Sequence, residues 1–347
     1  MINKKVNFKN SIKQVSRLLS LLIILAITFS LTACNVKDNS VQATQQPLKK
    51  VKLLLDYVPN TNHTGFFVAL YKNYYAAEGL DVEITQSAEG DSLESVASGQ
   101  MDFGVSFQES VTAARTASAP RPVKAIAAIL QHNTSGFASP TSKNIKRPAD
   151  FVGKRYGGWG TNIEKEFIKT LMKKDGADPE KVTYLSNNAT DIFAAFEKDA
   201  DFSWIYYGWD GVQAQLRNYP INFIKLQDID SRLDFYTPLI ITNENLINTD
   251  PDVIKRFMRA TAKGYTDCVN NPADAASYLM KKAPDTNADL AKASQKYLKN
   301  EYISDASSWG VMNVERWEVF GKWMFENGLI EKGLVAKDAF TNDFLTK

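Results

Sequence analysis

Short apolar runs alternate with amphipathic stretches from residue 51 onward. Val51–Leu55 is typical of a strand buried on both faces, and a helical pattern through Ala77 follows it, closed by Gly79. The alternation continues with expected strands at Val82–Ile84, Phe103–Phe107 and Val123–Leu130 and a helix over 91–98. Alternating strands and helices predict an α/β fold in which helices flank a parallel sheet.

The pattern restarts near residue 140. Phe151–Tyr156 is strand-like and leads into the glycine turn Gly157–Gly160, and Thr161 with Glu164 forms a capping box for a helix that reaches Lys174. Later expected elements are the strands Val182–Leu185 and Ala200–Trp204, the helix Asp191–Lys198, the apolar runs Phe223–Leu226 and Leu239–Ile241, and a helical remainder opened by Asp250-Pro251. This order predicts a bilobed α/β protein with residues 48–136 and 239–347 in one lobe and 137–238 in the other. Ligands of open parallel sheets bind beyond the carboxyl ends of strands, so we expect a ligand cleft between the lobes.

The first 33 residues differ from the rest of the chain. Five basic residues up to Arg17 precede the apolar stretch Leu18–Ala33, which is short for a membrane-spanning helix and typical of a secretory signal peptide. Its end, Leu31-Thr32-Ala33-Cys34, resembles the lipobox of bacterial lipoproteins, in which the cysteine is lipidated and becomes the first residue. We therefore expect a lipoprotein signal peptide at 1–33, a lipidated Cys34, a flexible tether over 34–47 and anchoring on the outer face of the cytoplasmic membrane. An ordinary signal peptide with an incidental cysteine is the alternative.

Composition narrows the class of protein. Of 347 residues 44% are apolar and 23% are charged, as in a globular protein with a large core. Without the five basic residues of the first 33 positions, the chain has 36 basic and 39 acidic residues. The resulting net charge of −3 argues against nucleic-acid binding. The two cysteines exclude a disulfide framework or a cysteine-rich metal site, and Cys268 is expected to be a small buried apolar residue. We expect no cofactor and no metal.

Residues 201–210 contain five aromatic side chains. Core packing accounts for those that alternate within the strand and accounts less well for Tyr206, Tyr207 and Trp209 near Gly208. Flat rings at a cleft provide stacking surfaces for a flat heteroaromatic ligand, so Tyr207 and Trp209 are candidates for ligand contact. Asp210 would accept from an exocyclic amine; its alternative role is to cap a helix that starts near Val212.

Other candidate ligand contacts lie in the loops that follow the expected strands: Tyr57, Asn60, His63, Ser106, Glu109 and Trp159. Tyr57 is a second stacking candidate, whereas Asn60 could simply close a turn. His63 and His132 are the only histidines, and no cysteine or acidic cluster completes a metal site with them. His63 either contacts ligand or braces its loop. Gly157–Gly160 could offer free backbone N–H groups to an anion, or form a tight turn only.

The loop Asp56–Gly65 (DYVPNTNHTG) resembles the first-strand motif of bacterial binding proteins for thiamine pyrimidine precursors. Further matches are Gln131–Gly136 (QHNTSG), Gly157–Gly160 (GGWG) and Trp204–Gly211 (WIYYGWDG), where Asp210 stands in place of the family's frequent glutamate. The resemblance implies a type II periplasmic-binding-protein fold and capture of formylaminopyrimidine or hydroxymethylpyrimidine. It also implies delivery to the permease and ATPase of an ABC importer, and we expect a monomer.

Two other functions remain open from the sequence. A receptor of the same fold could take a sulfonate, a nitrate-type anion or riboflavin. Eukaryotic relatives of the fold synthesise the same pyrimidine with a cysteine-rich iron site, whose ligands two cysteines cannot supply. The sequence contains no GxSxG elbow and no phosphate-binding loop with its lysine. It therefore favours a binding protein over an enzyme.

Overall fold

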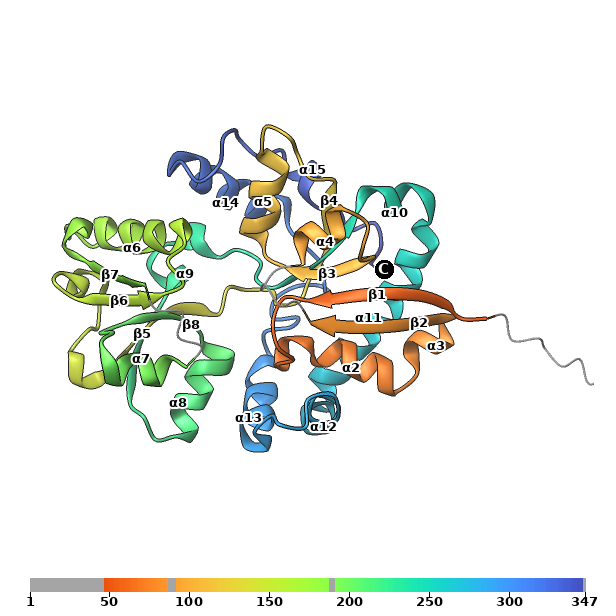
Figure 1. Cartoon of the computed structure of the whole chain (residues 1–347), viewed down its shortest axis with the longest axis horizontal. Helices are drawn as coiled ribbons and strands as arrows, with labels where there is room; N and C mark the ends of the chain where they lie inside the picture. The colour runs from red at the N-terminus through yellow and green to blue at the C-terminus, as the bar shows by residue number, and fades with distance from the viewer. Residues whose placement is uncertain (1–46, 87–91, 187–190, 346–347) are drawn as a thin grey trace, which may run out of the picture. The chain divides into compact units, whose positions relative to one another are not determined.

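The computed structural model describes residues 47–86, 92–186 and 191–345 (Figure 1). The predicted signal peptide, Cys34 and almost all of the predicted tether lie outside these residues. No helix among the described residues has the length and apolarity needed to cross a membrane.

The first sheet has five strands in the order β2-β1-β3-β10-β4. Their bounds are β1 (Lys49–Leu55), β2 (Leu80–Gln86), β3 (Phe103–Ser106), β4 (Val123–Ala128) and β10 (Leu239–Asn243). β1 runs parallel to β2, in register from Lys49 opposite Leu80 to Leu55 opposite Gln86, and parallel to β3. β10, which follows the second lobe in the chain, is antiparallel to β3 and β4. The α/β fold class is confirmed, but the sheet is mixed and not purely parallel.

Helices cover both faces of this first sheet (Figure 1). On one face, α2 (Thr64–Tyr71) and α11 (Pro251–Asn270) contribute Phe66, Phe67 and Phe257 to a core with the strands. On the other, α4 (Leu93–Ala97), α5 (Gln108–Thr116), α14 (Val314–Glu326) and α15 (Ala336–Ala339) pack on the sheet. Four more helices belong to this part of the structure: α3 (Tyr74–Ala77), α10 (Glu244–Thr249), α12 (Pro272–Lys282) and α13 (Ala288–Leu298). We call these elements and their sheet the first lobe.

The helical pattern expected through Ala77 is interrupted. Asn73 adopts a left-handed conformation with φ of 59°, and it separates α2 from α3. Gly79 and Gly99 follow with φ of 72° and 76°, values that favour glycine, and they end their helices as predicted.

Asp250 caps α11 through its side chain, which accepts from the Val253 N–H at 3.3 Å. Cys268 is fully buried, as expected.

The second lobe is built on the strands β5 to β9. Their bounds are β5 (Ser135–Pro140), β6 (Arg155–Gly158), β7 (Thr183–Ser186), β8 (Ser203–Tyr206) and β9 (Ile221–Lys225). β5 lies between β8 and β9 and is antiparallel to both, whereas β6 and β7 are parallel. A bridge between Tyr156 and Phe202 joins the two groups. The helices here are α6 (Asn162–Lys174), α7 (Ile192–Lys198), α8 (Val212–Leu216) and α9 (Leu226–Ile229).

The strand expected at Phe151–Tyr156 starts later than predicted. Pro148–Phe151 forms a single 3-10 turn, Gly153 has φ of 74°, and β6 then runs into the glycines themselves. The capping box of Thr161 and Glu164 at the head of α6 is confirmed.

Helix α14 packs against both lobes. Its Trp317 stacks on Phe340 of the first lobe at 5.4 Å between ring centroids. Its Phe320 stacks on Phe235 at 4.3 Å, and its Trp323 stacks on Phe167 of α6 at 5.3 Å. The sequence-based division assigned residues 239–347 to one lobe; the structure shows that α14 also completes the core of the other.

Candidate functional site

The loop after β1 is braced by a buried pair of side chains. His63 is fully buried, and its Nε2 lies 2.6 Å from Oδ1 of Asp56, which is 7% exposed. Nδ1 of His63 accepts the backbone N–H of Asn60 at 3.2 Å. Because Nδ1 is the acceptor, the ring proton is on Nε2 and is donated to Asp56. Of the two roles expected for His63, the structure supports bracing of the loop.

Asn60 and Tyr57 have different surroundings in the same loop. Asn60 caps the single-turn helix η1 (Thr61–His63): its side chain accepts from the Asn62 N–H at 2.9 Å. This geometry is that of a turn-closing residue, which was the simpler expectation. Tyr57 is 48% exposed directly beyond the strand, so its ring face is available to a ligand.

Tyr206, the last residue of β8, feels the charge of carboxylates from both lobes. Burial raises the pKa of the Tyr206 phenol well above its ordinary value, and the carboxylates of Glu109, Asp56 and Glu164 raise it further. Asp56 and Glu109 belong to the first lobe, whereas Glu164 and Tyr206 belong to the second. The Tyr206 hydroxyl is 3.4 Å from Oγ1 of Thr237, in the segment that returns to the first lobe. These observations make the end of β8 the candidate site.

Sequence reasoning did not select Tyr206 or Glu164. Tyr206 stood in the aromatic cluster as a residue poorly explained by core packing, which was the available signal. Ser106 and Glu109, which were predicted, lie at the end of β3 and on the first turn of α5. Ser106 is fully buried, and its hydroxyl has no hydrogen-bond partner within the described part of the chain.

The turn after β6 does not present free N–H groups. The backbone N–H groups of Trp159, Gly160 and Thr161 donate to the Glu164 carboxylate at 3.1, 2.8 and 3.2 Å. Glu164 is 1% exposed, and burial raises its pKa although these three bonds oppose the rise. A carboxylate of the protein itself therefore fills the place where an anionic ligand was considered, and that interpretation of the glycine turn is wrong.

Trp159 is the most exposed aromatic candidate. Its side chain is 55% exposed, and its ring meets the buried Trp204 edge to face at 5.9 Å. Trp204 in turn contacts Tyr206 at 5.5 Å between ring centroids. Trp159 thus offers an exposed ring that is connected to Tyr206 through the buried Trp204.

The aromatic segment after β8 forms a π-helical turn, η5 (Tyr207–Gly211). The Tyr207 ring packs against Phe223 at 4.9 Å and Tyr297 at 5.4 Å, and its hydroxyl accepts from Gln215 at 2.8 Å. These contacts give Tyr207 a structural role in the turn. Trp209 is only partly buried.

Asp210 is not the cap of α8. The residue that precedes α8 is Gly211, and no side chain caps this helix. The Asp210 carboxylate instead accepts from the backbone N–H of Tyr206, and burial raises its pKa to about 6. The nearby Asp191 carboxylate adds to the rise. The groups that shift the pKa of Asp210 include no positive charge. A buried carboxylate with a raised pKa of this kind is typical of functional acids.

His132 lies at the junction of the lobes and not against the carboxylate cluster. Its Nδ1 is 2.7 Å from Oδ2 of Asp234 and its Nε2 is 2.9 Å from Oδ1 of Asp305. Arg316 of α14 also contacts Asp234, at 3.3 Å. The hydrogen bond to Asp234 raises the pKa of His132 above 6.5. Across the described ranges, no group of three or more His, Cys, Asp or Glu side chains is arranged to hold a metal.

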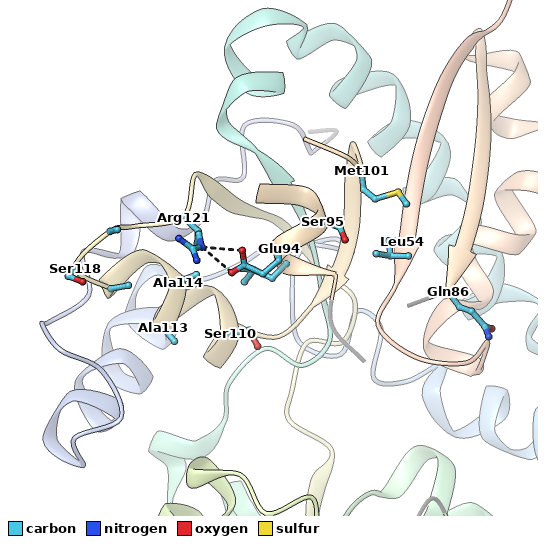
Figure 2. Close-up of a pocket in the computed structure, with 13 residues that line it drawn as sticks. Leu54, Gln86, Glu94, Ser95, Met101, Ser110, Ala113, Ala114, Ser118 and Arg121 are labelled. Atoms are coloured by element: carbon cyan, nitrogen blue, oxygen red, sulfur yellow. Dashed lines mark hydrogen bonds and ion pairs between the residues drawn. The ribbon is translucent and has the colours of Figure 1, made fainter. Parts of the chain in front are cut away.

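A separate hollow of about 940 Å³ lies between α4 and α5 (Figure 2). Its lining consists mainly of small and apolar residues, and Arg121 pairs with Glu94 at its edge, 3.0 Å apart. None of the predicted site residues, and none of the carboxylates around Tyr206, lines it. The candidate site therefore stays at the end of β8, apart from this hollow.

Comparison with known proteins places the chain in a family. A family model described as NMT1/THI5-like matches residues 60–275. The chain belongs to this family. It is 28% identical to the formylaminopyrimidine-binding protein of Halalkalibacterium halodurans, over 92% of this chain and 97% of that protein. It is 25% identical to the riboflavin-binding protein RibY of Chloroflexus aurantiacus, over 94% and 96% of the two chains.

Other family members are enzymes. A 4-amino-5-hydroxymethyl-2-methylpyrimidine phosphate synthase of Legionella pneumophila is 26% identical, over 85% of this chain and 92% of the synthase. The family resemblance expected from the loops is thus confirmed, and membership alone does not separate binding proteins from synthases.

Solved structures confirm the fold. The aliphatic sulphonate-binding protein SsuA of Escherichia coli superposes with a TM-score of 0.64 at 13% identity, over 84% of this chain and 91% of SsuA. The alkanesulfonate-binding protein SsuA of Xanthomonas axonopodis superposes with a TM-score of 0.63 at 11% sequence identity. The superposition covers 85% of this chain and 100% of that protein. At these identities the likeness shows the periplasmic-binding-protein fold alone.

Proposed function

We propose that the protein is an extracytoplasmic solute-binding protein that captures a thiamine pyrimidine precursor, formylaminopyrimidine or hydroxymethylpyrimidine. The cleft lies between residues 48–136 with 239–347 on one side and 137–238 on the other. The relation to a formylaminopyrimidine-binding protein over nearly the full length of both chains supports this ligand.

The charge of the site is the observation that carries the proposal. The carboxylates of Glu109, Asp56 and Glu164 all raise the pKa of Tyr206. Asp210, on the turn that follows Tyr206, adds a carboxylate whose own pKa is raised by burial. Carboxylates accept hydrogen bonds from amine donors with charge-assisted strength and repel anions. The N–H groups of the turn after β6, which could have bound an anion, are already occupied by Glu164. An aminopyrimidine with its exocyclic amine suits this site, whereas a sulfonate or nitrate does not.

Exposed rings supply the complementary contact. Trp159 at 55% and Tyr57 at 48% present open faces in the second and first lobes respectively, and Trp209 precedes Asp210 on η5. Aromatic pairs contribute about 0.5–1.5 kcal/mol beyond the burial of area. We propose that a flat ring stacks on one or more of these faces while Asp210 accepts from its amine.

The test is a comparison of ligands by calorimetric titration and thermal unfolding. Formylaminopyrimidine or hydroxymethylpyrimidine should stabilise the folded protein, by about 2.7 kcal/mol at a hundred times the dissociation constant. Taurine and nitrate should give no comparable shift. A larger shift with a sulfonate than with either pyrimidine would overturn the proposal. Mass spectrometry of small molecules released on denaturation checks the assignment independently.

Riboflavin is the second candidate ligand. The relation to RibY favours it, and its flat isoalloxazine ring would also stack on exposed aromatic side chains. Riboflavin lacks an exocyclic amine, so the Asp210→Asn substitution should weaken pyrimidine binding and leave riboflavin binding nearly unchanged. A riboflavin complex tighter than either pyrimidine complex would make riboflavin the ligand.

We propose a transport role and not synthesis, although synthases occur in the family. The chain has two cysteines, and Cys268 is fully buried, which is a poor donor set for a cysteine-rich iron site. The bound pyrimidine should be recovered unchanged after long incubation. In the proposed role, Cys34 carries the lipid anchor on the outer face of the cytoplasmic membrane, and the protein delivers its ligand as a monomer to the permease and ATPase of an ABC importer.

A further inference from the structure

A buried chain of hydrogen bonds joins the aromatic turn η5 of the second lobe to the first lobe. Ser294 of α13 is fully buried, and its hydroxyl donates to the carbonyl oxygen of Gly208. The same hydroxyl oxygen lies 2.5 Å from Oγ1 of Thr61 in η1. A carbonyl only accepts, so the single proton of Ser294 goes to Gly208 and the Thr61 hydroxyl donates to Ser294. We call this relay the Thr61–Ser294–Gly208 clasp.

The first-lobe end of the clasp is itself fixed. The Tyr302 hydroxyl donates to the carbonyl oxygen of Thr61 at 2.7 Å, and Gln295 on α13 donates to Tyr302 at 3.2 Å. Tyr265 donates to the carbonyl of the adjacent Asn62 at 2.7 Å. Both of these tyrosines are fully buried, so Thr61 is held in place from two sides.

The second-lobe end of the clasp fits closely against α13. A Cβ atom at Gly208 would lie 2.8 Å from Cδ2 of Leu298 and 3.4 Å from Cδ1 of Tyr297. The neighbouring Tyr207 ring already contacts Tyr297 at 5.4 Å between centroids. A side chain at this position would therefore require Leu298 to shift.

The clasp connects two parts of the proposed ligand site. Gly208 is followed directly by Trp209 and Asp210, and Thr61 lies in the loop whose ends are joined by the Asp56–His63 pair. We propose that Ser294 is a positioning residue for ligand binding: it fixes Trp209 and Asp210 of one lobe relative to the Asp56–His63 loop of the other. The effect on ligand affinity rests on the function proposed above; the effect on the turn itself does not.

Replacing Ser294 by alanine tests the clasp. Removal of a buried donor leaves the Gly208 carbonyl unsatisfied, so amide hydrogen exchange over residues 207–212 should be about 5- to 30-fold faster in the ligand-free variant. Pyrimidine affinity should fall about 3- to 10-fold, mainly through faster dissociation, because the ligand must then order the turn.

Ser92→Ala is the matched control. Ser92 is also fully buried and its hydroxyl also donates to a carbonyl, that of Val105 at 2.6 Å, but both residues belong to the first lobe. This control should leave exchange over 207–212 unchanged. Equal effects of the two substitutions on exchange over 207–212 would reduce Ser294 to a general stabilising residue and overturn the proposal.

Thr61 and Gly208 provide tests that do not depend on Ser294. Thr61→Val keeps the shape and removes the donor, so it should speed exchange over 207–212, whereas Thr61→Ser should restore wild-type exchange. Gly208→Ala places a methyl group against Leu298 and should weaken ligand binding more than Ser294→Ala does. If Thr61→Val and Thr61→Ser exchange alike, the hydroxyl relay is refuted.

The exchange measurement and the binding measurement test two different proposals, so each proposal can be refuted without the other. Wild-type protein that binds no pyrimidine would refute the proposed ligand, while slow wild-type exchange and fast Ser294→Ala exchange would still support the clasp. Unchanged exchange in Ser294→Ala would refute the clasp even if pyrimidine binds tightly.

Discussion

Asp210→Asn distinguishes a ligand-binding carboxylate from a structural one. Burial raises the pKa of Asp210 from 3.8 to about 6. Because each pKa unit corresponds to about 1.4 kcal/mol, keeping Asp210 ionised at neutral pH costs the folded protein at most about 3 kcal/mol. Asparagine keeps the size of the side chain and an acceptor oxygen for the Tyr206 N–H, and it removes this cost.

The sign of the effect follows from the direction of the shift. The folded protein holds the Asp210 proton more tightly than the unfolded chain does. The contribution of Asp210 to stability is therefore fully present below about pH 4 and is lost as the pH rises through about 6. Urea unfolding at about pH 7.5 should therefore show Asp210→Asn to be about 1–3 kcal/mol more stable than the wild type. The two proteins should be equally stable near pH 4.

Ligand binding should change in the opposite direction. Loss of a charge-assisted hydrogen bond of about 1.5–3 kcal/mol predicts affinity about 10- to 150-fold weaker in calorimetric titration. Asp191→Asn is the control, because Asp191 caps α7 and raises the pKa of Asp210 without belonging to the proposed ligand contacts. Asparagine caps as well as aspartate, so this variant should keep its affinity.

Two results would refute this reasoning about Asp210. Unchanged pyrimidine affinity in Asp210→Asn would remove the carboxylate from the ligand site. Unchanged or lower stability near pH 7.5 would show that ionised Asp210 is not penalised by burial in the folded protein.

Three further predictions concern other parts of the chain. Trp209→Ala should weaken pyrimidine binding by about 0.5–1.5 kcal/mol or more with little change in melting temperature, and an unchanged dissociation constant would exclude stacking on this ring. The raised pKa of His132, bonded to Asp234, means that this pair stabilises the fold below pH 6.5 and that the benefit is lost as the pH rises through the folded-state pKa. His132→Asn should therefore flatten the pH dependence of stability above about pH 6 in denaturant titrations. Cys34→Ala should release the protein from membranes or leave an unprocessed precursor in cell fractionation, because stable attachment needs the two acyl chains of the anchor; normal processing and attachment would contradict the lipobox.

Much of the local structure could be predicted because its determinants are close in sequence. Apolar runs located β1 and β10, and the pair Thr161 and Glu164, three residues apart, predicted the start of α6. Asp210 could be selected as a candidate because an acid beside aromatic residues is visible in one short segment. The environment of Asp210 could not be predicted, because its pKa is raised by burial and by the Asp191 carboxylate, which the fold brings into range.

The arrangement of the site was decided by the tertiary structure. The sequence by itself determined the α/β class, most element positions, the family motifs and several site candidates, because periodicity, caps and loop motifs depend on residues a few positions apart. Only the fold set the antiparallel direction of β10, the packing of α14 on both lobes and the capture of the glycine-turn N–H groups by Glu164. It also placed Tyr206 where the charges of Glu109, Asp56 and Glu164 raise its pKa. Asp56 and Tyr206 are 150 positions apart in the chain, and such contacts depend on how the chain crosses between the sheets, which no local pattern encodes.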